Sequence, residues 1–263
     1  MAKKAIVIGA GIAGIAAAIR LRVKGFEVQV FEKNAYPGGK LSEIQTNGFR
    51  FDAGPSLFTM PHYVDELFEL AGKKPTDYFR YTRLDEVCRY FWNDGMRFTA
   101  ESDRASFASK ASKVFQVPKE EVFAKLDKAA FIEETTGKLF LEQSLHKPSG
   151  FLNKQTAKAI LRMPQLGLNK SLHEVNEKSL SHPKLVQLFD RYATYNGSNP
   201  YETPGIMEVI PHYEYNVGAF FPEKGMVNIT RSLVKLAEDL GVSFSLNTEV
   251  AEIMTQGNTI TCL

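Results

Sequence analysis

The chain has 263 residues, 44% of them apolar, which predicts a globular protein of one or two domains with a sizeable core and excludes a disordered chain. Its 32 Lys and Arg against 30 Asp and Glu leave a net charge of +2, too small to indicate nucleic-acid binding. Cys88 and Cys262 form no CxxC pair, which excludes a disulfide scaffold and a thiolate zinc site and favours a reducing cytoplasm.

The first thirty residues read as one unit. Residues 5–8 form a β-branched run without alternation, which predicts a parallel strand buried on both faces. The segment Gly9-Ala10-Gly11-Ile12-Ala13-Gly14 follows directly, and residues 15–24 then predict a helix ended by Gly25. A second strand, at 28–31, ends at Glu32. This order of strand, GxGxxG, helix, strand and acid is typical of dinucleotide binding; the alternative is an ordinary βαβ unit with a fortuitous acid.

Each part of this unit has a physical role. Gly9 permits the tight turn out of the strand, Gly11 lets the backbone approach a pyrophosphate, and Gly14 lets the helix lie close to the sheet. The pyrophosphate would then lie at the positive end of the helix dipole. Glu32 can accept hydrogen bonds from both ribose hydroxyls and would repel a 2′-phosphate, so a free ribose is favoured over NADP.

The segment Pro37-Gly38-Gly39-Lys40 lies shortly after Glu32. A glycine pair beside a base offers backbone N–H groups and a cation to a second part of a long ligand, which favours FAD over NAD. The alternative is a simple Pro-Gly turn with a surface lysine.

The middle of the chain predicts helices and one hairpin. Residues 61–71 read as a helix capped by Gly72, and Asn93-Asp94-Gly95 predicts a hairpin between strands at 85–92 and 96–99. Residues 102–140 are helical in pattern, with a break at Val117-Pro118 because proline suits a first helical turn. The hairpin fits a substrate-side sheet that is separate from the nucleotide sheet.

Residues 144–172 form the stretch with the most unusual charge, because they hold five bases and no acid. Apolar side chains lie between the bases, a combination that suits an anionic membrane surface, where each base contributes about 1 kcal/mol. The alternative is a solvated helix face over the core. The bases are Lys147, Lys154, Lys158, Arg162 and Lys170.

After Pro222 the pattern returns to that of the nucleotide domain. An amphipathic helix is predicted at 228–240, strands at 242–246 and 248–253, and a turn at Gly257-Asn258. Residues 259–263 begin another strand that stops without a closing element.

Several of these segments carry a family resemblance. The opening AIVIGAGIAGIAAAIRLRVKGFEVQVFEKNAYPGGK resembles that of the FAD-dependent amine oxidase and carotenoid desaturase superfamily. GFRFDAGPS at 48–56 is similar to the phytoene desaturase branch, as are FDRYATYNGSNPY at 189–201 and GAFFPEKGM at 218–226, although many members have a glycine where Lys224 stands. The closest likeness is to the bacterial hydroxycarotenoid 3,4-desaturases, with phytoene desaturase next.

The resemblance implies an α/β fold: a Rossmann-like FAD-binding domain of the glutathione-reductase-like superfamily with an inserted α+β substrate domain. It implies FAD-binding segments at 1–72 and 218–263 and a substrate and membrane-facing domain at 73–217. No catalytic residue can be named, and the spacing of the five histidines predicts no metal site. The implied cofactor-binding residues are Gly9, Ala10, Gly11, Ile12, Ala13, Gly14, Glu32, Lys33, Gly38, Gly39, Lys40, Gly54, Pro55, Ser56 and Val250.

Two of these implications concern the limits of the site. The backbone of the residue matching Val250 meets the adenine in the superfamily; the alternative is plain sheet packing. Family members continue well beyond residue 263, so the resemblance implies an amino-terminal portion of a desaturase, truncated at its carboxyl end and lacking part of the isoalloxazine site.

The implied reaction is dehydrogenation of a long polyene, in which a hydride equivalent leaves an allylic carbon for the flavin and a proton leaves the neighbouring carbon. The implied partners are a long apolar polyene and, through 144–172, the inner face of the cytoplasmic membrane. One alternative is a flavin amine oxidase. The other is a non-catalytic prenyl- or isoprenoid-binding protein of the same fold, against which the intact GxGxxG and Glu32 argue, because a carrier need not keep a pyrophosphate cradle.

Overall fold

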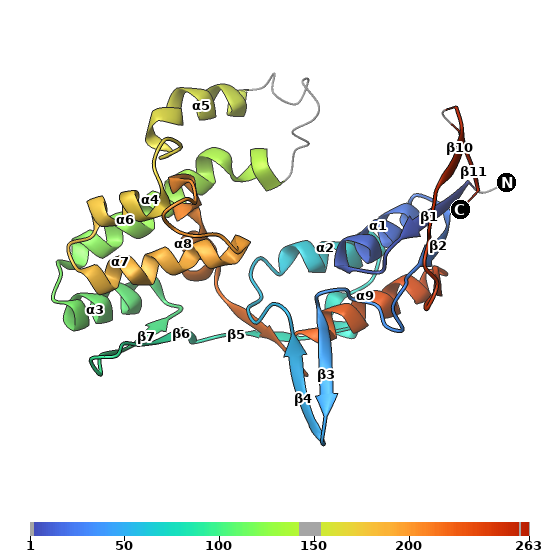
Figure 1. Cartoon of the computed structure of the whole chain (residues 1–263), viewed down its shortest axis with the longest axis horizontal. Helices are drawn as coiled ribbons and strands as arrows, with labels where there is room; N and C mark the ends of the chain where they lie inside the picture. Colours follow the sequence, from blue (N-terminus) through green and yellow to red (C-terminus); the bar gives the residue numbers. More distant parts are fainter. Residues whose placement is uncertain (1–2, 142–153, 258, 263) are drawn as a thin grey trace. The chain divides into compact units, whose positions relative to one another are not determined.

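The computed structural model describes residues 3–141, 154–257 and 259–262, and the chain divides into two compact units (Figure 1). Unit 1 comprises Met1–Arg83 and Phe220–Leu263, and unit 2 comprises Leu84–Ala219. The sequence predicts domain boundaries after residues 72 and 217, whereas the chain passes from one unit to the other after residues 83 and 219.

A three-stranded parallel sheet organises unit 1. Strands β1 (Lys4–Ile8), β2 (Glu27–Phe31) and β9 (Ser243–Ser245) lie in the order β1-β2-β9. Helix α1 (Ile12–Val23) connects β1 to β2, and helix α9 (Val227–Asp239) precedes β9. The predicted strand–glycine loop–helix–strand unit and the predicted helix at 228–240 are therefore confirmed, with α1 beginning at Ile12 rather than Ile15.

The expectation that β1 is buried on both faces is wrong. Ala5 and Val7 pack against the core of unit 1, whereas Ile6 and Ile8 on the opposite face are each 49% exposed. Within the described part of the chain β1 pairs only with β2, so it is an edge strand with one covered face. An unalternating apolar run does not distinguish that situation from a strand buried on both faces.

The rest of unit 1 contains the predicted helix α2 (His62–Leu70), a 3-10 turn η1 (Pro75–Asp77) and three antiparallel pairs. Figure 1 shows one of these pairs, β3 and β4, as a projecting hairpin. The sequence reading missed it, although its Asn47-Gly48 turn, with both φ angles positive, is the strongest short hairpin signal. The pairs are β3 (Ser42–Thr46) with β4 (Phe49–Ala53), β5 (Tyr81–Arg83) with β8 (Phe220–Pro222), and β10 (Met254–Gln256) with β11 (Thr259–Cys262).

The predicted strand at 248–253 is also wrong, because residues 246–253 have no regular secondary structure. Asn247 has a φ of 52°, and its N–H donates to Asn34 O (3.1 Å). The N–H of Thr248 donates to Glu32 O (2.9 Å). These two bonds hold the start of the segment next to the end of β2, where the chain turns instead of extending as a strand. The preceding strand, predicted at 242–246, is present as β9.

Unit 2 is mainly helical. Its hairpin of β6 (Glu86–Phe91) and β7 (Arg97–Glu101) confirms the prediction from Asn93-Asp94-Gly95. The predicted helical break is also confirmed, because the preceding helix ends at Phe115 and the next residue, Gln116, has a left-handed φ of 54°. The helices are α3 (Arg104–Phe115), α4 (Lys119–Leu141), α5 (Lys154–Arg162), α6 (Leu172–Ser179), α7 (Pro183–Asp190) and α8 (Ile210–His212), with shorter 3-10 turns η3 (Met163–Gln165), η4 (Arg191–Asn196) and η5 (Gly205–Val209) and a π-helical turn η6 (Tyr213–Val217).

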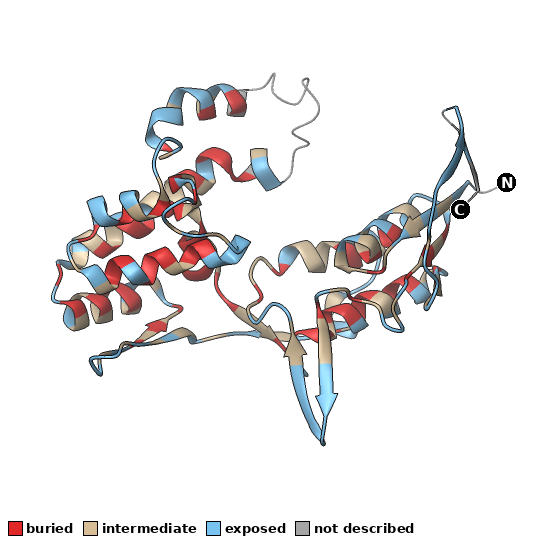
Figure 2. Cartoon of the chain, in the orientation of Figure 1, coloured by how far each residue is buried: buried red, intermediate tan, exposed pale blue. Residues whose placement is uncertain are grey.

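Each unit has its own hydrophobic core. In unit 1 the buried faces of α1 and α9 pack together over the sheet. In unit 2 the core is aromatic, and Figure 2 shows buried stripes along α3, α4, α6 and α7. No helix in the described ranges combines the length and the apolar character that crossing a bilayer would take. The fully buried aromatic side chains of unit 2 are Phe98, Phe107, Phe115, Phe189, Tyr192 and Tyr215.

Candidate functional site

The glycine loop between β1 and α1 places open backbone at the amino terminus of α1. A Cβ on Gly14 would lie 2.0 Å from Gly9 O, so only glycine lets α1 lie this close to the end of β1. A Cβ on Gly11 would meet no atom within 4 Å, so the space beside Gly11 is open. The first N–H groups of a helix have no partner within the helix, and here they lie next to this open space.

A hollow of about 490 Å³, which we call the loop cavity, opens at this point. Lys40 is the one charged side chain among the described residues that line it. Most of the remaining wall is apolar, which suits a flat, largely apolar ring system beside a charged group. The lining residues are Gly11, Ile12, Ala13, Gly38, Lys40, Leu41, Pro55, Leu57, Phe58, Thr59, Val64, Met226 and Ile229.

Three segments that are distant in sequence meet at the loop cavity. Gly38 forms a parallel bridge with Gly11, and its N–H donates to Ala10 O (2.7 Å). Gly54, with a φ of 105°, lies so close to the Lys40 carbonyl that a Cβ would be 2.0 Å from that oxygen. The Gly38-Gly39-Lys40 and Gly54-Pro55 segments therefore pack at the helix amino terminus.

Glu32 lies at the end of β2, and its side chain is held by the protein. One carboxylate oxygen accepts the N–H of Ala10 (2.8 Å), and the other accepts the N–H (2.9 Å) and the side-chain amide (2.7 Å) of Asn34. Burial alone would raise the pKa of Glu32, which is 6% exposed, but the hydrogen bonds from Asn34 and Ala10 lower it below its ordinary value. A carboxylate can accept about four hydrogen bonds, so these three leave room for about one further donor. The ribose contact of Glu32 stays a prediction.

Asp52 joins the GFRFDAGPS segment to α9. Its Oδ1 accepts the N–H of Val227 at the start of α9 (3.3 Å) and pairs with Arg50 (2.9 Å). Burial would raise the pKa of Asp52, but the bond from Arg50 and the backbone N–H groups of Met226 and Val227 lower it below its ordinary value. Asp52 therefore holds α9 against the strand that leads to Gly54.

Val250 borders a second hollow, of about 330 Å³, at the end of β2. This hollow is lined by Phe31, which directly precedes Glu32, and by the irregular segment 248–252 together with Met254. A backbone that is not engaged in a sheet at this position can offer its N–H and C=O groups to a base. The adenine contact of Val250 stays a prediction.

The remaining predicted site residues lie at the edges of this arrangement. Lys33 and Ser56 are exposed and line neither hollow. Gly39 follows Gly38 with a φ of 59°. The sequence reading missed the role of Asn34 in holding Glu32 and the apolar wall from Leu57, Met226 and Ile229. The only signal for that wall is apolar residues soon after a glycine-rich turn, which is common in any core.

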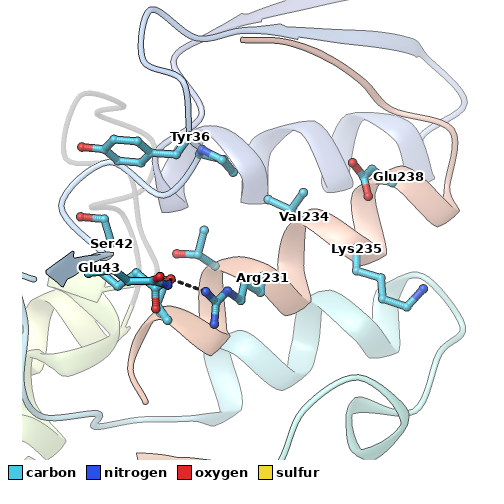
Figure 3. Close-up of a pocket in the computed structure, with 11 residues that line it drawn as sticks. Tyr36, Ser42, Glu43, Arg231, Val234, Lys235 and Glu238 are labelled. Carbon is cyan, nitrogen blue, oxygen red and sulfur yellow. Dashed lines mark hydrogen bonds and ion pairs between the residues drawn. The ribbon is translucent and has the colours of Figure 1, made fainter. Parts of the chain in front are cut away.

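A third hollow, of about 460 Å³, lies between the 36–45 segment and α9 and holds none of the predicted site residues (Figure 3). Both bases that line it are already paired with acids, since Arg231 bonds to Glu43 and Lys235 lies 3.4 Å from Asp239, so neither base is free to hold a phosphate. We therefore assign the candidate site to the loop cavity and the Val250 hollow.

The residues present fit a dinucleotide with a pyrophosphate. Unpaired helix N–H groups and Lys40 supply positive charge, the space beside Gly11 would be filled by any Cβ, and Glu32 lies between the loop and the Val250 hollow. Among the residues that the structure describes, no cluster of His, Cys, Asp and Glu could hold a metal ion.

A family model and several curated relatives match nearly the whole chain. A family model described as flavin containing amine oxidoreductase matches residues 12–263. The 1-hydroxycarotenoid 3,4-desaturase of Flavobacterium sp. (strain P99-3) is 49% identical over 98% of this chain and 53% of its own length. The 4,4'-diapolycopene oxygenase of Methylomonas sp is 33% identical over 97% of this chain and 51% of its own length. The chain spans about half the length of the curated relatives it matches.

Solved structures share the fold at low identity. An oxidoreductase from Methanosarcina mazei matches with a TM-score of 0.61 and 18% identity over 98% of this chain and 54% of that one. Cyclohexylamine oxidase from Brevibacterium oxydans IH-35A matches with a TM-score of 0.57 and 16% identity over 94% and 51%. A Rab GDI from Plasmodium falciparum matches with a TM-score of 0.51 and 12% identity over 99% and 62%.

Proposed function

We propose that this chain, which belongs to the flavin containing amine oxidoreductase family, is the cofactor-binding part of an FAD-dependent carotenoid desaturase. One observation carries the proposal: the curated relatives that match along nearly the whole chain are named as desaturases and oxygenases of carotenoids. The solved amine oxidases share the fold at far lower identity, which says nothing about substrate.

The family supports a flavin, and the site supports FAD in particular. The N–H groups of Ile12 and Ala13 and the side chain of Lys40 would hold the pyrophosphate. Glu32 would accept a hydrogen bond from a ribose hydroxyl at its remaining lone pair. The backbone of Val250 would face the adenine. When bound, FAD supplies the two-electron acceptor that a desaturation needs.

The chain's own residues would contribute binding, orientation and exclusion of water. Leu57, Met226 and Ile229 line the loop cavity with apolar side chains, which offer no hydrogen bonds that would compete with Lys40 for the pyrophosphate. A long polyene has no charge to recognise, so a dry apolar surface is the chemistry that binds it. The substrate class proposed from the Flavobacterium relative is a hydroxycarotenoid.

Peripheral contact with the inner face of the membrane is part of the proposal, because carotenoids dissolve in the bilayer. The segment predicted for this contact is 144–172, of which residues 144–153 lie outside the described residues. The described remainder supports the contact, since α5 and the turn after it carry bases and exposed apolar side chains, including Leu161 at 81% exposure.

A chimera tests the desaturase proposal. Residues 1–263 would replace the matching part of the Flavobacterium 1-hydroxycarotenoid 3,4-desaturase, and the chimera would be expressed in carotenoid-producing bacteria. We expect the hydroxycarotenoid to gain one double bond, seen as a red-shifted absorbance by chromatography, and the same chimera carrying Gly11→Val to lose that product. A chimera that retains FAD and releases peroxide with amines, but leaves the polyene unchanged, would contradict the proposal and favour an amine oxidase.

A further inference from the structure

We propose that α5 and the turn that follows it dock onto a lipid bilayer by inserting apolar side chains, while Glu134 weakens the attraction of two neighbouring bases to anionic headgroups. We call residues 156–168 the α5 surface. The inference rests on the proposed membrane contact and deepens it, since it names the inserting residues and predicts which lipid property the surface recognises.

The α5 surface has two apolar sides, and the described residues of the chain cover one of them. Ala159 and Leu166 are buried at 6% and 4% exposure, and α5 packs on α4. The other side is open, and Figure 2 shows α5 as largely exposed. The large apolar side chains on it are Ile160 (58% exposed), Leu161 (81%), Met163 (46%) and Leu168 (46%).

Charge identifies the occupant of this open side as lipid. Every charged side chain of residues 156–170 is basic, namely Lys158, Arg162 and Lys170. Apolar groups flanked only by bases match the acyl and headgroup layers of a membrane surface, which place apolar chains beneath phosphates.

The bases are not all available, because Glu134 on α4 pairs with two of them. Its Oε1 accepts a hydrogen bond from Lys158 Nζ (2.6 Å) and lies 3.8 Å from Arg162 Nη1. Arg162 is further held by Thr135 Oγ1 (3.2 Å) and by the face of Phe131. The bond from Lys158 also lowers the pKa of Glu134, so this carboxylate is charged at neutral pH.

The pairing with Glu134 lowers the net positive charge that this part of the α5 surface presents to a membrane. Lys158, Arg162 and Glu134 together carry a net charge of +1 instead of the +2 of the bases alone, and a headgroup layer responds to the net charge within a Debye length. Insertion of apolar side chains is then the larger contribution to binding. We therefore expect binding that depends less on salt and on the fraction of anionic lipid than the bases alone would give.

The test measures co-sedimentation of the 263-residue chain with vesicles of phosphatidylcholine, and of phosphatidylcholine with one-third phosphatidylglycerol. Leu161→Gln should weaken binding to both vesicles about tenfold, because the inserted side chain is lost. Glu134→Gln keeps the side-chain size and removes the charge, so it should strengthen binding to the anionic vesicles about fivefold and leave binding to the neutral vesicles unchanged. Phe49→Gln, at a residue 68% exposed on β4, is the matched control and should change neither.

The possible results distinguish failure of this inference from failure of the proposed membrane contact and of the proposed desaturase function. A wild-type chain that binds neither vesicle would overturn the membrane contact, whereas the chimera experiment would still decide the desaturase function. Binding that Leu161→Gln leaves intact would overturn the inserting role of the α5 surface, and a loss in Phe49→Gln would assign insertion to the β3–β4 hairpin instead. Unchanged anionic binding in Glu134→Gln would overturn the role of Glu134.

Discussion

The carboxylate of Glu32 accepts a hydrogen bond from the backbone N–H of Ala10, a residue 22 positions earlier in the chain, at 2.8 Å. This bond ties the glycine loop to the end of β2, and the bonds from Asn34 to the other oxygen tie the same carboxylate to the following loop. Glu32 therefore holds the glycine loop in place as well as being the residue predicted to contact the ribose.

Replacement of Glu32 should remove both roles at once. We expect Glu32→Ala to lose FAD retention, because the Ala10 N–H is left without its partner and the ribose without an acceptor. The measurement is the ratio of flavin to protein absorbance after gel filtration of protein loaded with FAD. Glu27→Ala, an exposed acid at the start of the same strand, should retain flavin. Full retention in Glu32→Ala would refute the assignment.

Two glycines of the loop should respond differently to substitution. A Cβ at Gly11 meets no atom within 4 Å, so Gly11→Val should leave the melting temperature nearly unchanged and abolish FAD retention. A Cβ at Gly14 would lie 2.0 Å from Gly9 O, so Gly14→Ala should lower the melting temperature by several degrees. Calorimetry and flavin absorbance on both variants check this pair. Equal melting losses in the two would show that Gly11 does not border open space.

The contact of Asp52 with the start of α9 should make stability depend on pH. The pKa of Asp52 in the folded chain lies below its ordinary value of 3.8, so the charged form is favoured by folding. The contribution is complete above pH 3.8 and is lost as pH falls through the lower folded value. We expect Asp52→Asn to cost about 1 kcal/mol at pH 7. Urea unfolding at pH 7 and at a series of lower pH values measures it, and a difference between variant and wild type that does not shrink as the pH falls below 3.8 would count against this cause.

An ion pair in unit 2 with one fully buried member should matter more for stability than surface pairs do. Glu214 is fully buried and accepts hydrogen bonds from Arg191 Nη2 (3.0 Å), Tyr192 (2.8 Å) and Tyr195. Glu214→Gln leaves the Arg191 charge without its partner and should cost about 3 kcal/mol in the free energy of unfolding.

The control for this pair is Glu101, whose surface bond to Lys110 is 2.9 Å long. Glu101→Gln should cost less than about 1 kcal/mol. Denaturant titration of both variants gives the comparison, and equal losses would mean that burial of Glu214 adds nothing.

The sequence predicted the strand–glycine loop–helix–strand part of unit 1 well because its signals are local. Strand, glycine loop, helix and acid follow one another within 32 residues, and each glycine answers a requirement of the backbone next to it. The same holds for the hairpin at Asn93-Asp94-Gly95 and for the break at Val117-Pro118. The turn at Asn47-Gly48 carries an equally local signal for the β3–β4 hairpin, which the sequence analysis did not include.

The rest depends on contacts that no local pattern encodes. Residues 248–253 alternate like a strand, yet Thr248 is bonded to Glu32, which lies more than two hundred positions away. The exposure of Ile6 and Ile8 depends on which elements cover the sheet, and the pairing of Glu134 with Lys158 depends on how α5 packs on α4. The charge pattern of 144–172 does not reveal this partner, because Glu134 lies outside that segment.

The most direct test of the central claim is a calorimetric titration of the purified chain with FAD, ADP and FMN. If the glycine loop, Glu32 and Val250 hold the adenine nucleotide half of FAD, then FAD and ADP bind, FMN binds at least tenfold more weakly, and Gly11→Val abolishes the first two. Binding of FMN as tight as that of FAD, or FAD binding that survives Gly11→Val, would contradict the account.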